Sequence, residues 1–350
     1  SIAAVTGTSA TNTVIFQSES GDSNLVNLTY APTSSNNYTV RFNGCDYVTF
    51  KKMKVIATGT SYAVVFRYET GSTYCNIERC LIQGWNTTST STDLSAVYAA
   101  GSTLNGSVIQ MNKISDGSYG VYMTGSNSAV QILQNTITNQ YYYGIYASSQ
   151  TALTISKNII SSNTAYTSYY GMYLSSSGAN LVVTKNKVSI VNGYAGIYVY
   201  SCSASSGTRG LIANNMVSLA GSGSGYGIYN YYSTYQNYYY NSVNVTRTYS
   251  SSSAFMCGST SSNNIQLQNN VFANFGGGYA IYTDYSSINV SDYNDLYATG
   301  SYLGYWYGSN CSTITNWRSS SGMDVHSLSI LPGFTSTTDL HICNASLNGA

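Results

Sequence analysis

Charged residues are scarce in this sequence, and their scarcity excludes several kinds of function. Only 13 of the 350 residues are Lys or Arg, 12 are Asp or Glu and two are His, so the formal net charge is +1. Such a chain has no overall field that attracts nucleic acid. Its basic cluster of Lys51, Lys52 and Lys54 is too small for a nucleic-acid interface. We therefore expect no nucleic-acid partner.

Proline and long apolar stretches are also nearly missing. The two prolines are Pro32 and Pro332, so every residue between them can donate a backbone N–H to a β-ladder. No run of about 18 apolar residues occurs, which predicts that no helix spans a membrane. The seven cysteines are too sparse for a disulfide-rich scaffold.

In place of charge, the chain carries 37 Tyr and many small polar residues in a repeated pattern. One phrase is a small, an aliphatic and an aromatic residue, as in Gly144-Ile145-Tyr146. Its aromatic member recurs at Tyr98, Tyr122, Tyr146, Tyr173, Tyr198, Tyr229 and Tyr282. A second phrase (Asn, any residue, aliphatic) alternates with the first along the chain. Its asparagines are Asn112, Asn135, Asn158, Asn186, Asn215, Asn241 and Asn270.

The spacing of the two phrases predicts the fold. Repeats of roughly 25 residues are too short for propeller blades, and no helical period accompanies them. Units this short bury a core only when they stack, and parallel stacking places equivalent residues about 4.8 Å apart. The sequence therefore predicts an all-β fold, a single right-handed parallel β-helix of nine or ten coils. We expect an N-terminal cap or first strands at 1–40, coils at 41–299 and a closing segment at 300–350.

The asparagines of the second phrase have a predicted structural role. Asn tolerates a bend between strands, and stacked Asn side chains hydrogen-bond from coil to coil. We therefore expect these seven residues to form an interior column, called the Asn ladder below.

Several segments resemble a known group of proteins. They include Gly7–Gln17, Asp46-Tyr47-Val48-Thr49-Phe50, Gln140–Tyr146 and Asp292–Tyr297. They resemble large secreted β-helix repeat proteins of Bacteroidota, and the likeness covers almost the whole chain. The resemblance implies export by the type IX secretion route and an extracellular or cell-surface location.

Candidate residues for acid–base chemistry are few. β-Helices host polysaccharide lyases and hydrolases, but glycoside hydrolysis needs two facing carboxylates. No carboxylate lies between Asp116 and Asp284, and the motifs of polygalacturonases and pectate lyases are absent. We therefore expect no catalytic residue, no cofactor and no enzymatic activity. Asp284, Asp292 and Asp295 are a weak calcium candidate, although turn chemistry explains them better.

Cysteine and aromatic residues supply the remaining candidate sites. Cys311 and Cys343 flank the closing segment and are a possible disulfide. In consecutive Tyr residues, strand alternation turns at least one ring outward, where it can contact a partner. The candidate contact aromatics are Tyr141, Tyr142, Tyr143, Tyr169, Tyr170, Tyr231, Tyr232, Tyr238, Tyr239 and Tyr240.

These features favour an extracellular structural or adhesive protein. Low net charge and outward Tyr rows suit association with copies of itself, as a filament or surface layer. The alternative is a glycan-binding module that uses outward Tyr together with Trp85, Trp306 or Trp317. A polysaccharide lyase or hydrolase is the third hypothesis.

Overall fold

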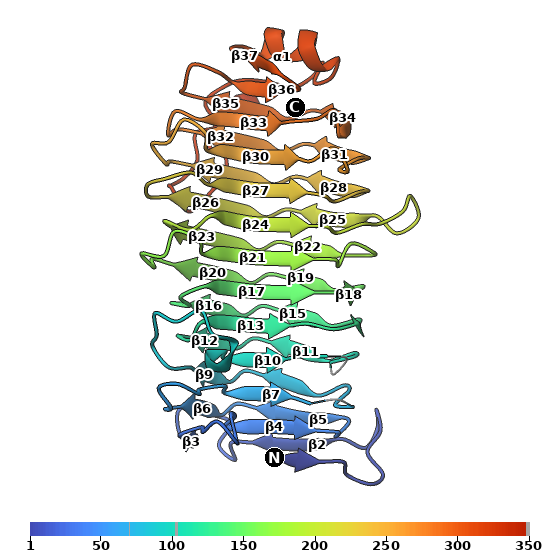
Figure 1. The fold of residues 1–350 in the computed structure, drawn as a ribbon, viewed down its shortest axis with the longest axis vertical. Coiled ribbons are helices and arrows are strands. Elements are labelled where there is room, and N and C mark those ends of the chain that lie inside the picture. Colours follow the sequence, from blue (N-terminus) through green and yellow to red (C-terminus); the bar gives the residue numbers. More distant parts are fainter. Residues whose placement is uncertain (70, 102–103, 348–350) are drawn as a thin grey trace. The chain divides into compact units, whose positions relative to one another are not determined.

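The protein, seen in a computed structural model, is described for residues 1–69, 71–101 and 104–347. It consists of two compact units, Ser1–Ser162 and Asn163–Ala350. In each unit the chain passes repeatedly through three parallel sheets, and one strand of each sheet makes up one coil (Figure 1). We number the sheets 1, 2 and 3 in the order in which the chain enters them. The prediction of an all-β parallel β-helix is confirmed, with about ten turns.

The first unit holds the strands drawn in blue to green in Figure 1. Its sheet 1 contains β1 (Ile2–Ala3), β4 (Val40–Asn43), β7 (Phe66–Tyr68), β10 (Val97–Ala99), β13 (Tyr119–Met123) and β17 (Tyr143–Ser148). Its sheet 2 contains β2 (Val14–Gln17), β5 (Val48–Lys51), β8 (Asn76–Glu78), β11 (Val108–Gln110), β15 (Gln131–Leu133) and β19 (Thr154–Ser156). Its sheet 3 contains β3 (Asn27–Tyr30), β6 (Lys54–Ala57), β9 (Leu81–Gln83), β12 (Lys113–Ser115), β16 (Thr136–Thr138) and β20 (Ile159–Ser162). A short pair, β14 (Asn127–Ser128) and β18 (Gln150–Thr151), and a 3-10 turn, η1 (Thr92–Leu94), complete it.

The second unit repeats this arrangement. Its sheet 1 contains β21 (Tyr170–Ser175), β24 (Ala195–Tyr200), β27 (Tyr226–Tyr231), β30 (Ser253–Gly258), β33 (Tyr279–Thr283), β36 (Gly304–Trp306) and the antiparallel β37 (Ser309–Cys311). Its sheet 2 contains β22 (Val182–Thr184), β25 (Gly210–Ala213), β28 (Gln236–Tyr239), β31 (Ile265–Gln268) and β34 (Ile288–Asp292). Its sheet 3 contains β23 (Lys187–Val191), β26 (Met216–Ala220), β29 (Ser242–Val245), β32 (Val271–Asn274) and β35 (Asp295–Ala298).

The first phrase builds the core because its small and aliphatic members meet sheet 3 inside the coil. Ile228 pairs in register with Ile197 of the preceding coil, and both side chains are fully buried. A Cβ at Gly227 would lie 2.2 Å from Cγ1 of Val243 and 2.7 Å from the carbonyl oxygen of Ala254. A larger residue there would force the two sheets apart, which explains the small residue at this position.

The bend before sheet 3 is made by the residue that precedes each ladder Asn. These residues have positive φ angles near +55°, and they are Met111, Gln134, Lys157, Lys185, Asn214, Tyr240, Asn269 and Tyr293. Arg79 makes the same bend before Cys80, which takes the place of Asn in its coil. The expectation that Asn itself takes the bend is therefore wrong. The bending residue turns its side chain outward and so needs no particular chemistry, whereas the next residue faces the interior and must satisfy its polar atoms there.

The Asn side chains are buried and hydrogen-bonded from coil to coil in both units. In the first unit, Nδ2 of Asn112 donates to Oδ1 of Asn135 at 3.0 Å, and Asn135 donates to Asn158 at 3.0 Å. In the second unit, 3.0 Å bonds run from Asn186 to Asn215 and on through Asn241, Asn270 and Asn294. Each Oδ1 also accepts the backbone N–H of the preceding ladder residue, at 2.9 to 3.1 Å.

The segments outside the predicted coils have separate roles. Residues 1–40 supply β1, β2 and β3, which pair in register with β4, β5 and β6 of the next coil. Residues 300–347 supply β36, β37, α1 (Ile314–Ser321) and the 3-10 turn η2 (Ala345–Leu347). The last three residues of the predicted closing segment, 348–350, lie outside the described part.

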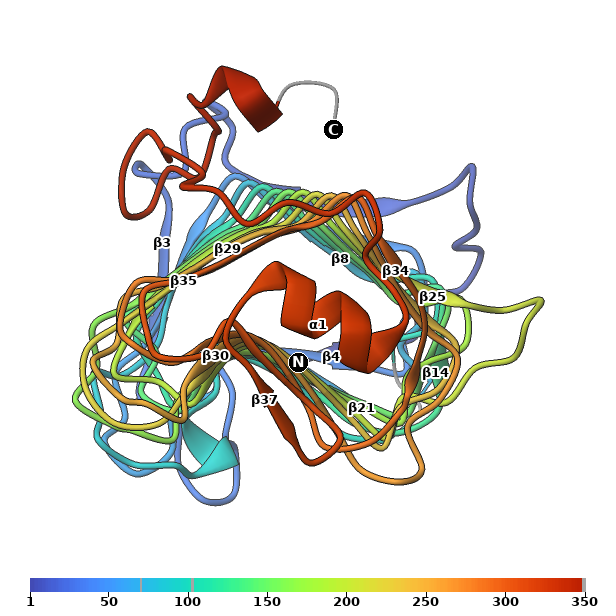
Figure 2. The same cartoon turned by 90° about the horizontal axis from the view of Figure 1, so that it is seen from above.

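Helix α1 closes the interior of the second unit (Figure 2). Thr313 caps its N-terminus by accepting the N–H of Asn316, and Gly322 ends it in the left-handed region at φ 70°. The buried Trp317 packs edge-on against Trp306, with 5.5 Å between the ring centroids. Beyond the helix, residues 329–347 form a tail over the outer face of sheet 3, where Ser218 and Asn244 both donate to the carbonyl of Thr337. No helix within the described ranges is long and apolar enough to cross a membrane.

Candidate functional site

The aromatic member of the first phrase forms an outward column on sheet 1. In the second unit it joins other tyrosines of the same sheet in one cluster, called the tyrosine face here. Its members are Tyr170, Tyr173, Tyr194, Tyr198, Tyr200, Tyr226, Tyr229, Tyr231, Met256, Tyr279, Tyr282, Tyr302 and Tyr305. The strands repeat in register, so Tyr198 pairs with Tyr229 and Tyr229 with Met256. Because each coil places a Tyr, or in one coil Met256, at this position, the side chains of successive coils form a continuous surface.

The rings of the tyrosine face cover one another. Tyr198 and Tyr229 stack with centroids 4.7 Å apart, and Tyr282 and Tyr305 stack at 4.4 Å with an interplanar angle of 8°. Tyr173 meets Tyr198 edge-on at 5.1 Å. Because the ring faces are occupied by neighbouring rings, the surface offers mainly ring edges and hydroxyl groups.

Buried hydroxyl groups of this face hold their protons more tightly than an exposed Tyr does. Burial raises the pKa of Tyr194 to about 12 and raises the pKa of Tyr198 and Tyr229 further still. Burial also raises the pKa of the nearby Asp284 carboxyl, and a hydrogen bond from Tyr282 partly offsets that rise. The face therefore combines neutral hydroxyl donors and acceptors with one weakly acidic carboxyl.

A groove of about 370 Å³ opens beside the C-terminal end of the tyrosine face. Its lining residues are Ser250, Ser251, Gly277, Gly278, Tyr279, Tyr282, Ser301 and Tyr302. The buried Asn274 shapes the groove, because its Oδ1 accepts the N–H groups of Gly276 and Gly278 and its Nδ2 donates to the carbonyls of Ser252 and Tyr279. These bonds fix a glycine-rich loop in which Gly276 and Gly278 have no room for a side chain. A Cβ at Gly278 would lie 2.1 Å from the Ser252 carbonyl oxygen.

Cationic side chains of the second unit are not exposed on this face; Arg247 comes near it, against Gly225 beside Tyr226, but is buried. Arg209 covers the ring of Tyr235 and donates to Asn237 on sheet 2. Arg247 is buried in a turn, where its guanidinium donates to the carbonyls of Ala220 and Ser224. Arg318 belongs to α1, and Lys185 and Lys187 lie at the bend before sheet 3 and on that sheet. The tyrosine face therefore lacks the cations that would neutralise an anionic ligand.

The predicted contact aromatics are spread over several surfaces. Tyr143, Tyr169 and Tyr238 are buried. The partly buried members are Tyr141, Tyr142, Tyr170, Tyr231 and Tyr239, and the exposed ones are Tyr232 and Tyr240. Only Tyr170 and Tyr231 belong to the tyrosine face. The sequence signal for this face is the repeated aromatic residue of the first phrase and not the runs of consecutive Tyr.

Two further expected contacts differ in the structure. Trp317 is fully buried under the closing segment and cannot contact a glycan, because its indole N–H is committed to Asp324. The expected disulfide between Cys311 and Cys343 is not formed, and both thiols are free. Cys311 is buried at the end of β37, whereas Cys343 is exposed in the tail with its sulfur 3.4 Å from the Thr335 hydroxyl.

The three acids of the weak calcium candidate do not converge. Asp284 follows β33 of sheet 1, Asp292 ends β34 of sheet 2 and Asp295 begins β35 of sheet 3. In the described part of the chain, no three His, Cys, Asp or Glu side chains gather into a group that could hold a metal ion. The two bends between these strands separate the carboxylates, so we assign no calcium site.

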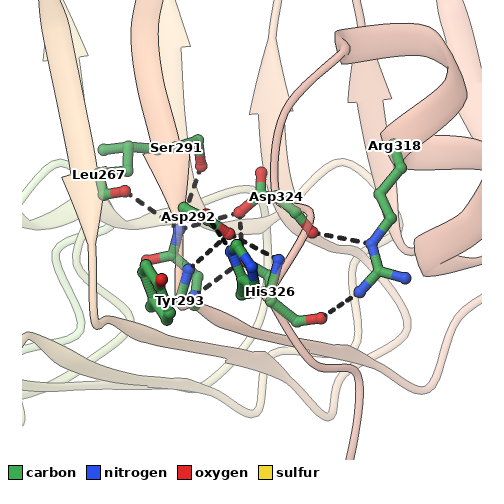
Figure 3. A network of polar contacts seen from close by, with 9 residues as sticks. Leu267, Ser291, Asp292, Tyr293, Arg318, Asp324 and His326 are labelled. Atoms are coloured by element: carbon green, nitrogen blue, oxygen red, sulfur yellow. Dashed lines mark hydrogen bonds and ion pairs between the residues drawn. The ribbon is translucent and has the colours of Figure 1, made fainter.

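Asp292 and Asp324 instead take part in a polar network that closes the second unit (Figure 3). Oδ2 of Asp292 lies 2.7 Å from Nδ1 of His326, whose ring stacks on Tyr293 at 4.8 Å. Burial opposes ionisation of Asp292, but hydrogen bonds from His326 and Tyr293 outweigh it and hold the pKa of Asp292 below its ordinary value.

Asp324 ends the Asn ladder of the second unit. Its buried carboxylate accepts Nδ2 of Asn294 at 3.0 Å, the hydroxyl of Ser327 at 2.5 Å and Nε1 of Trp317 at 2.7 Å. Every ladder amide donates toward this end, so the amide dipoles align head to tail and their positive end meets the negative charge. Arg318 supports the same loop by donating to the Asp324 carbonyl (Figure 3).

Asp295 is buried beside the tail with one oxygen unpartnered. Its Oδ1 accepts the N–H of Ile330 at 3.0 Å, while Oδ2 has no hydrogen-bond partner. Burial raises the pKa of Asp295 to about 6, and the Ile330 bond opposes that rise. The carboxyl lines a groove of about 240 Å³ together with Tyr240, Tyr293 and Ile342.

Several solved structures share the fold of this chain. The Dettilon tailspike protein gp208 matches with a TM-score of 0.52 and 13% identity over 92% of this chain and 63% of its own. The periplasmic alginate epimerase AlgG matches with a TM-score of 0.50 and 14% identity over 83% of this chain and 70% of its own. The A-module of mannuronan C-5 epimerase AlgE6 from Azotobacter vinelandii matches with a TM-score of 0.45 and 10% identity over 87% and 72%. The chain thus spans less than two thirds of the tailspike's length.

The expectation that the chain is not an enzyme is contradicted by these matches. A periplasmic alginate epimerase carries the same fold over most of this chain. Scarcity of carboxylates was the basis of that expectation, and it is not a sufficient reason because polysaccharide-active enzymes occur on this scaffold.

The sequence comparisons agree with the architecture. Residues 38–204 match the family model described as right handed beta helix region. Comparison with curated protein sequences gives no match. The chain is a right-handed parallel β-helix protein.

Proposed function

We propose that this protein is a surface-exposed, glycan-binding β-helix whose tyrosine face and adjoining groove hold a neutral polysaccharide. The observation that carries the proposal is the in-register wall of half-buried Tyr beside a groove lined by serines and Tyr302. Polysaccharides are long and rich in hydroxyl groups, so a long surface with many neutral hydroxyls offers them matching hydrogen bonds.

The chemistry of the face favours hydrogen bonding over stacking. Sugar rings commonly pack on an exposed aromatic face, but here the ring faces are covered by neighbouring tyrosines. Each Tyr hydroxyl can both donate and accept, and the groove adds the hydroxyls of Ser250, Ser251 and Ser301. Such a surface recognises a hydroxyl-rich ligand without displacing the rings from one another.

The charge of the face favours a neutral sugar polymer. Asp284 is the ionisable carboxyl beside Tyr282, and the nearby Arg247 is buried, with its guanidinium bonded to backbone carbonyls. An anionic polymer such as a polyuronate would meet no counter-charge there. The likeness of the fold to an alginate epimerase supports a carbohydrate ligand. The charge of this face favours a neutral polymer over the anionic alginate.

Binding to a defined panel tests this proposal. The 350-residue chain is titrated with a neutral glucan, a neutral mannan and the polyuronate alginate by calorimetry, and the reaction products are followed in parallel. We expect binding to at least one neutral polymer, and a loss of roughly 2- to 10-fold in affinity in both Tyr282→Phe and Tyr302→Phe, because each removes only a hydroxyl.

Tyr240→Phe is the matched control, because Tyr240 is 59% exposed but lies outside the tyrosine face. Its affinity is expected to equal that of the unmodified chain. Equal losses in all three variants, or binding to alginate alone, would contradict the proposal.

Self-association is a second candidate function, favoured by a different surface. In the first unit, strands β2 and β3 expose large apolar side chains, including Ile15 at 50% and Leu28 at 37%, with Leu25 at 68% between the strands. Edge strands with apolar side chains are sites where a second copy can add.

Light scattering over a range of concentrations tests this candidate. We expect the mean mass to rise with concentration and the rise to be lost in Leu28→Lys. Ile159→Lys is the control, because Ile159 is also 49% exposed in the first unit but lies away from the edge strands. A constant monomer mass at every concentration would rule this function out.

A further inference from the structure

Two buried thiols in the first unit face each other. Cys45 precedes β5 and Cys75 precedes β8 of the next coil, and both side chains have no exposed surface. Their sulfur atoms lie 3.6 Å apart, which is direct contact. The Cys75 thiol also donates to the backbone carbonyl of Cys45 at 3.0 Å.

The surrounding backbone holds this arrangement in place. The N–H of Cys75 donates to the Ser107 hydroxyl at 3.0 Å, and its carbonyl accepts the hydroxyl of the buried Tyr68 at 3.1 Å. Tyr47 and Tyr74, which lie close to the two cysteines in sequence, stack with centroids 4.8 Å apart and parallel rings. These contacts on both sides of the cysteine pair hold the two coils at the spacing that brings the thiols together.

We propose that Cys45 and Cys75 are a site of disulfide formation that staples two consecutive coils of the first unit. A disulfide needs the sulfurs to approach to about 2.05 Å, a movement of roughly 1.5 Å from their present contact. The site requires an oxidant, and a small-molecule disulfide such as oxidised glutathione is sufficient.

The reaction is an ordinary thiol–disulfide exchange. The Cys45 thiolate attacks one sulfur of oxidised glutathione and releases one glutathione as its thiolate, which takes up the proton that Cys45 lost. The Cys75 sulfur then attacks the Cys45 sulfur of the mixed disulfide and releases the second glutathione. Two protein thiols lose two electrons and two protons, and one oxidised glutathione becomes two reduced molecules.

The roles of the two sulfurs follow from their contacts. Contact with the Cys75 side chain is the main cause that lowers the pKa of the Cys45 thiol, so Cys45 ionises and attacks first once docking has brought the two side chains together. Neither sulfur is accessible in the folded unit, so the bond forms while the coils are docking. A staple formed at that stage locks the register of the coils.

Other buried cysteines are suited to act as internal controls. Cys202 donates to the carbonyl of Leu174, and Cys257 accepts from the side chain of Asn230. Burial raises the pKa of both thiols to about 12. Cys80, near Cys75 in sequence, donates to the Glu78 carbonyl at 3.4 Å, and burial raises its pKa to about 11. None of these three thiols has a recorded sulfur contact with another cysteine in the described structure.

Mass spectrometry of refolded protein tests the proposal. The full chain is refolded with a mixture of oxidised and reduced glutathione, blocked with an alkylating reagent and digested with trypsin. Cleavage after Arg41, Lys51, Arg67 and Arg79 puts Cys45, Cys75 and Cys80 on three different peptides. We expect a cross-linked pair of peptides 42–51 and 68–79 with two hydrogens fewer than the reduced pair. We also expect the reduced protein to melt roughly 5 °C lower.

Two Cys→Ser variants show which cysteines form the cross-link and cause the melting shift. Cys45→Ser should abolish the cross-link and make the melting temperature independent of reductant, whereas Cys202→Ser should keep both the cross-link and the shift. The peptide map of the unmodified chain decides the matter even if Cys45→Ser folds poorly. Fully alkylated Cys45 and Cys75 after oxidative refolding, or a cross-link that maps to other cysteines, would overturn the proposal.

Discussion

The Asn ladder and the tyrosine face are both columns of one residue type repeated once per coil, but they stabilise the second unit differently. The ladder is buried, and each amide satisfies its neighbour through directional hydrogen bonds, as between Asn215 and Asn241. The tyrosine face is half-exposed and is held by ring packing, as between Tyr198 and Tyr229. The ladder therefore tolerates no change of functional group, whereas the face can lose hydroxyls without losing its packing. Because of that difference, a ligand can engage hydroxyls of the face without disturbing its ring packing.

The largest effect is expected where the ladder ends in a charge. Asp324→Ala removes the acceptor for the donors of Asn294, Trp317 and Ser327, all of them buried. Buried donors without a partner retain their full desolvation cost, so we expect the free energy of unfolding to fall by about 3–5 kcal/mol. Chemical unfolding followed by Trp fluorescence measures this loss.

Asp339→Ala is the control for this change. The side chain of Asp339, in the tail, is 40% exposed and pairs with the exposed His341, so its loss should leave the unfolding midpoint nearly unchanged. Similar losses in the two variants would show that Asp324 does not anchor the ladder.

Interrupting the ladder in its middle should cost less than removing its end. Asn215→Leu leaves the Nδ2 and N–H of Asn186 without their acceptor and removes the side-chain donor to the Oδ1 of Asn241, which keeps only the bond from the backbone N–H of residue 215. We expect a loss of about 1–3 kcal/mol in the free energy of unfolding.

The matched control for the ladder is Asn263→Leu, because the Asn263 side chain is exposed and its two hydrogen bonds, to the Ser261 carbonyl at 3.4 Å and from the Asn264 amide at 2.8 Å, are solvent-exposed and local. It should leave the unfolding midpoint unchanged. If Asn215→Leu melts with the unmodified chain, the ladder does not stabilise the coils.

The sequence predicted those parts of the fold that repeat. Residues such as Ile197 and Asn215 recur at one coil's spacing, and a parallel stack translates that spacing directly into contacts. The bending residue could not be identified, because its side chain faces solvent and Arg79, Met111 and Tyr240 serve equally well. The residue that follows the bend faces the interior and must satisfy its polar atoms there, whereas the bending residue can be of many types.

The candidate sites depended on contacts that do not repeat. The bond between Asn294 and Asp324 joins residues 30 positions apart through a helix whose docking has no periodic signal. The burial of Trp317 follows from the same docking. The groove beside Tyr302 arises from loops held by Asn274, whose role depends on the backbone path of Gly276 and Gly278. Such contacts are set by tertiary structure alone.

A rise in pH should lower the stability of the second unit through Asp295, which belongs to neither the Asn ladder nor the tyrosine face. The folded pKa of Asp295 is about 6, above the value of about 3.9 for an unfolded Asp. Between these values the folded chain holds a proton that the unfolded chain has lost, so stability falls as the pH rises from 4 to 6 and this contribution is constant above and below.

Asp295→Asn tests this assignment, because it keeps the shape of the side chain and removes the charge. We expect the unmodified chain to lose about 1–3 kcal/mol more than Asp295→Asn between pH 4 and 7, measured by chemical unfolding at each pH. Parallel pH profiles for the two proteins would show that the buried carboxyl does not ionise in this range.

The smallest effect is expected on the tyrosine face, and it sharpens the contrast with the ladder. Tyr229 stacks on Tyr198 and contacts Tyr226 and Tyr231 through its ring, with centroids 4.7 to 5.4 Å apart. Tyr229→Phe keeps these contacts and should change the free energy of unfolding by less than about 0.5 kcal/mol. Tyr229→Ala removes the ring and should cost about 1–3 kcal/mol, since the lost apolar area and ring packing are not replaced.

Thermal unfolding of both variants separates the contribution of the hydroxyl from that of the ring. A loss in Tyr229→Phe as large as that in Asn215→Leu would mean that hydroxyl bonds hold this face together, and a glycan could then not engage them without weakening the face.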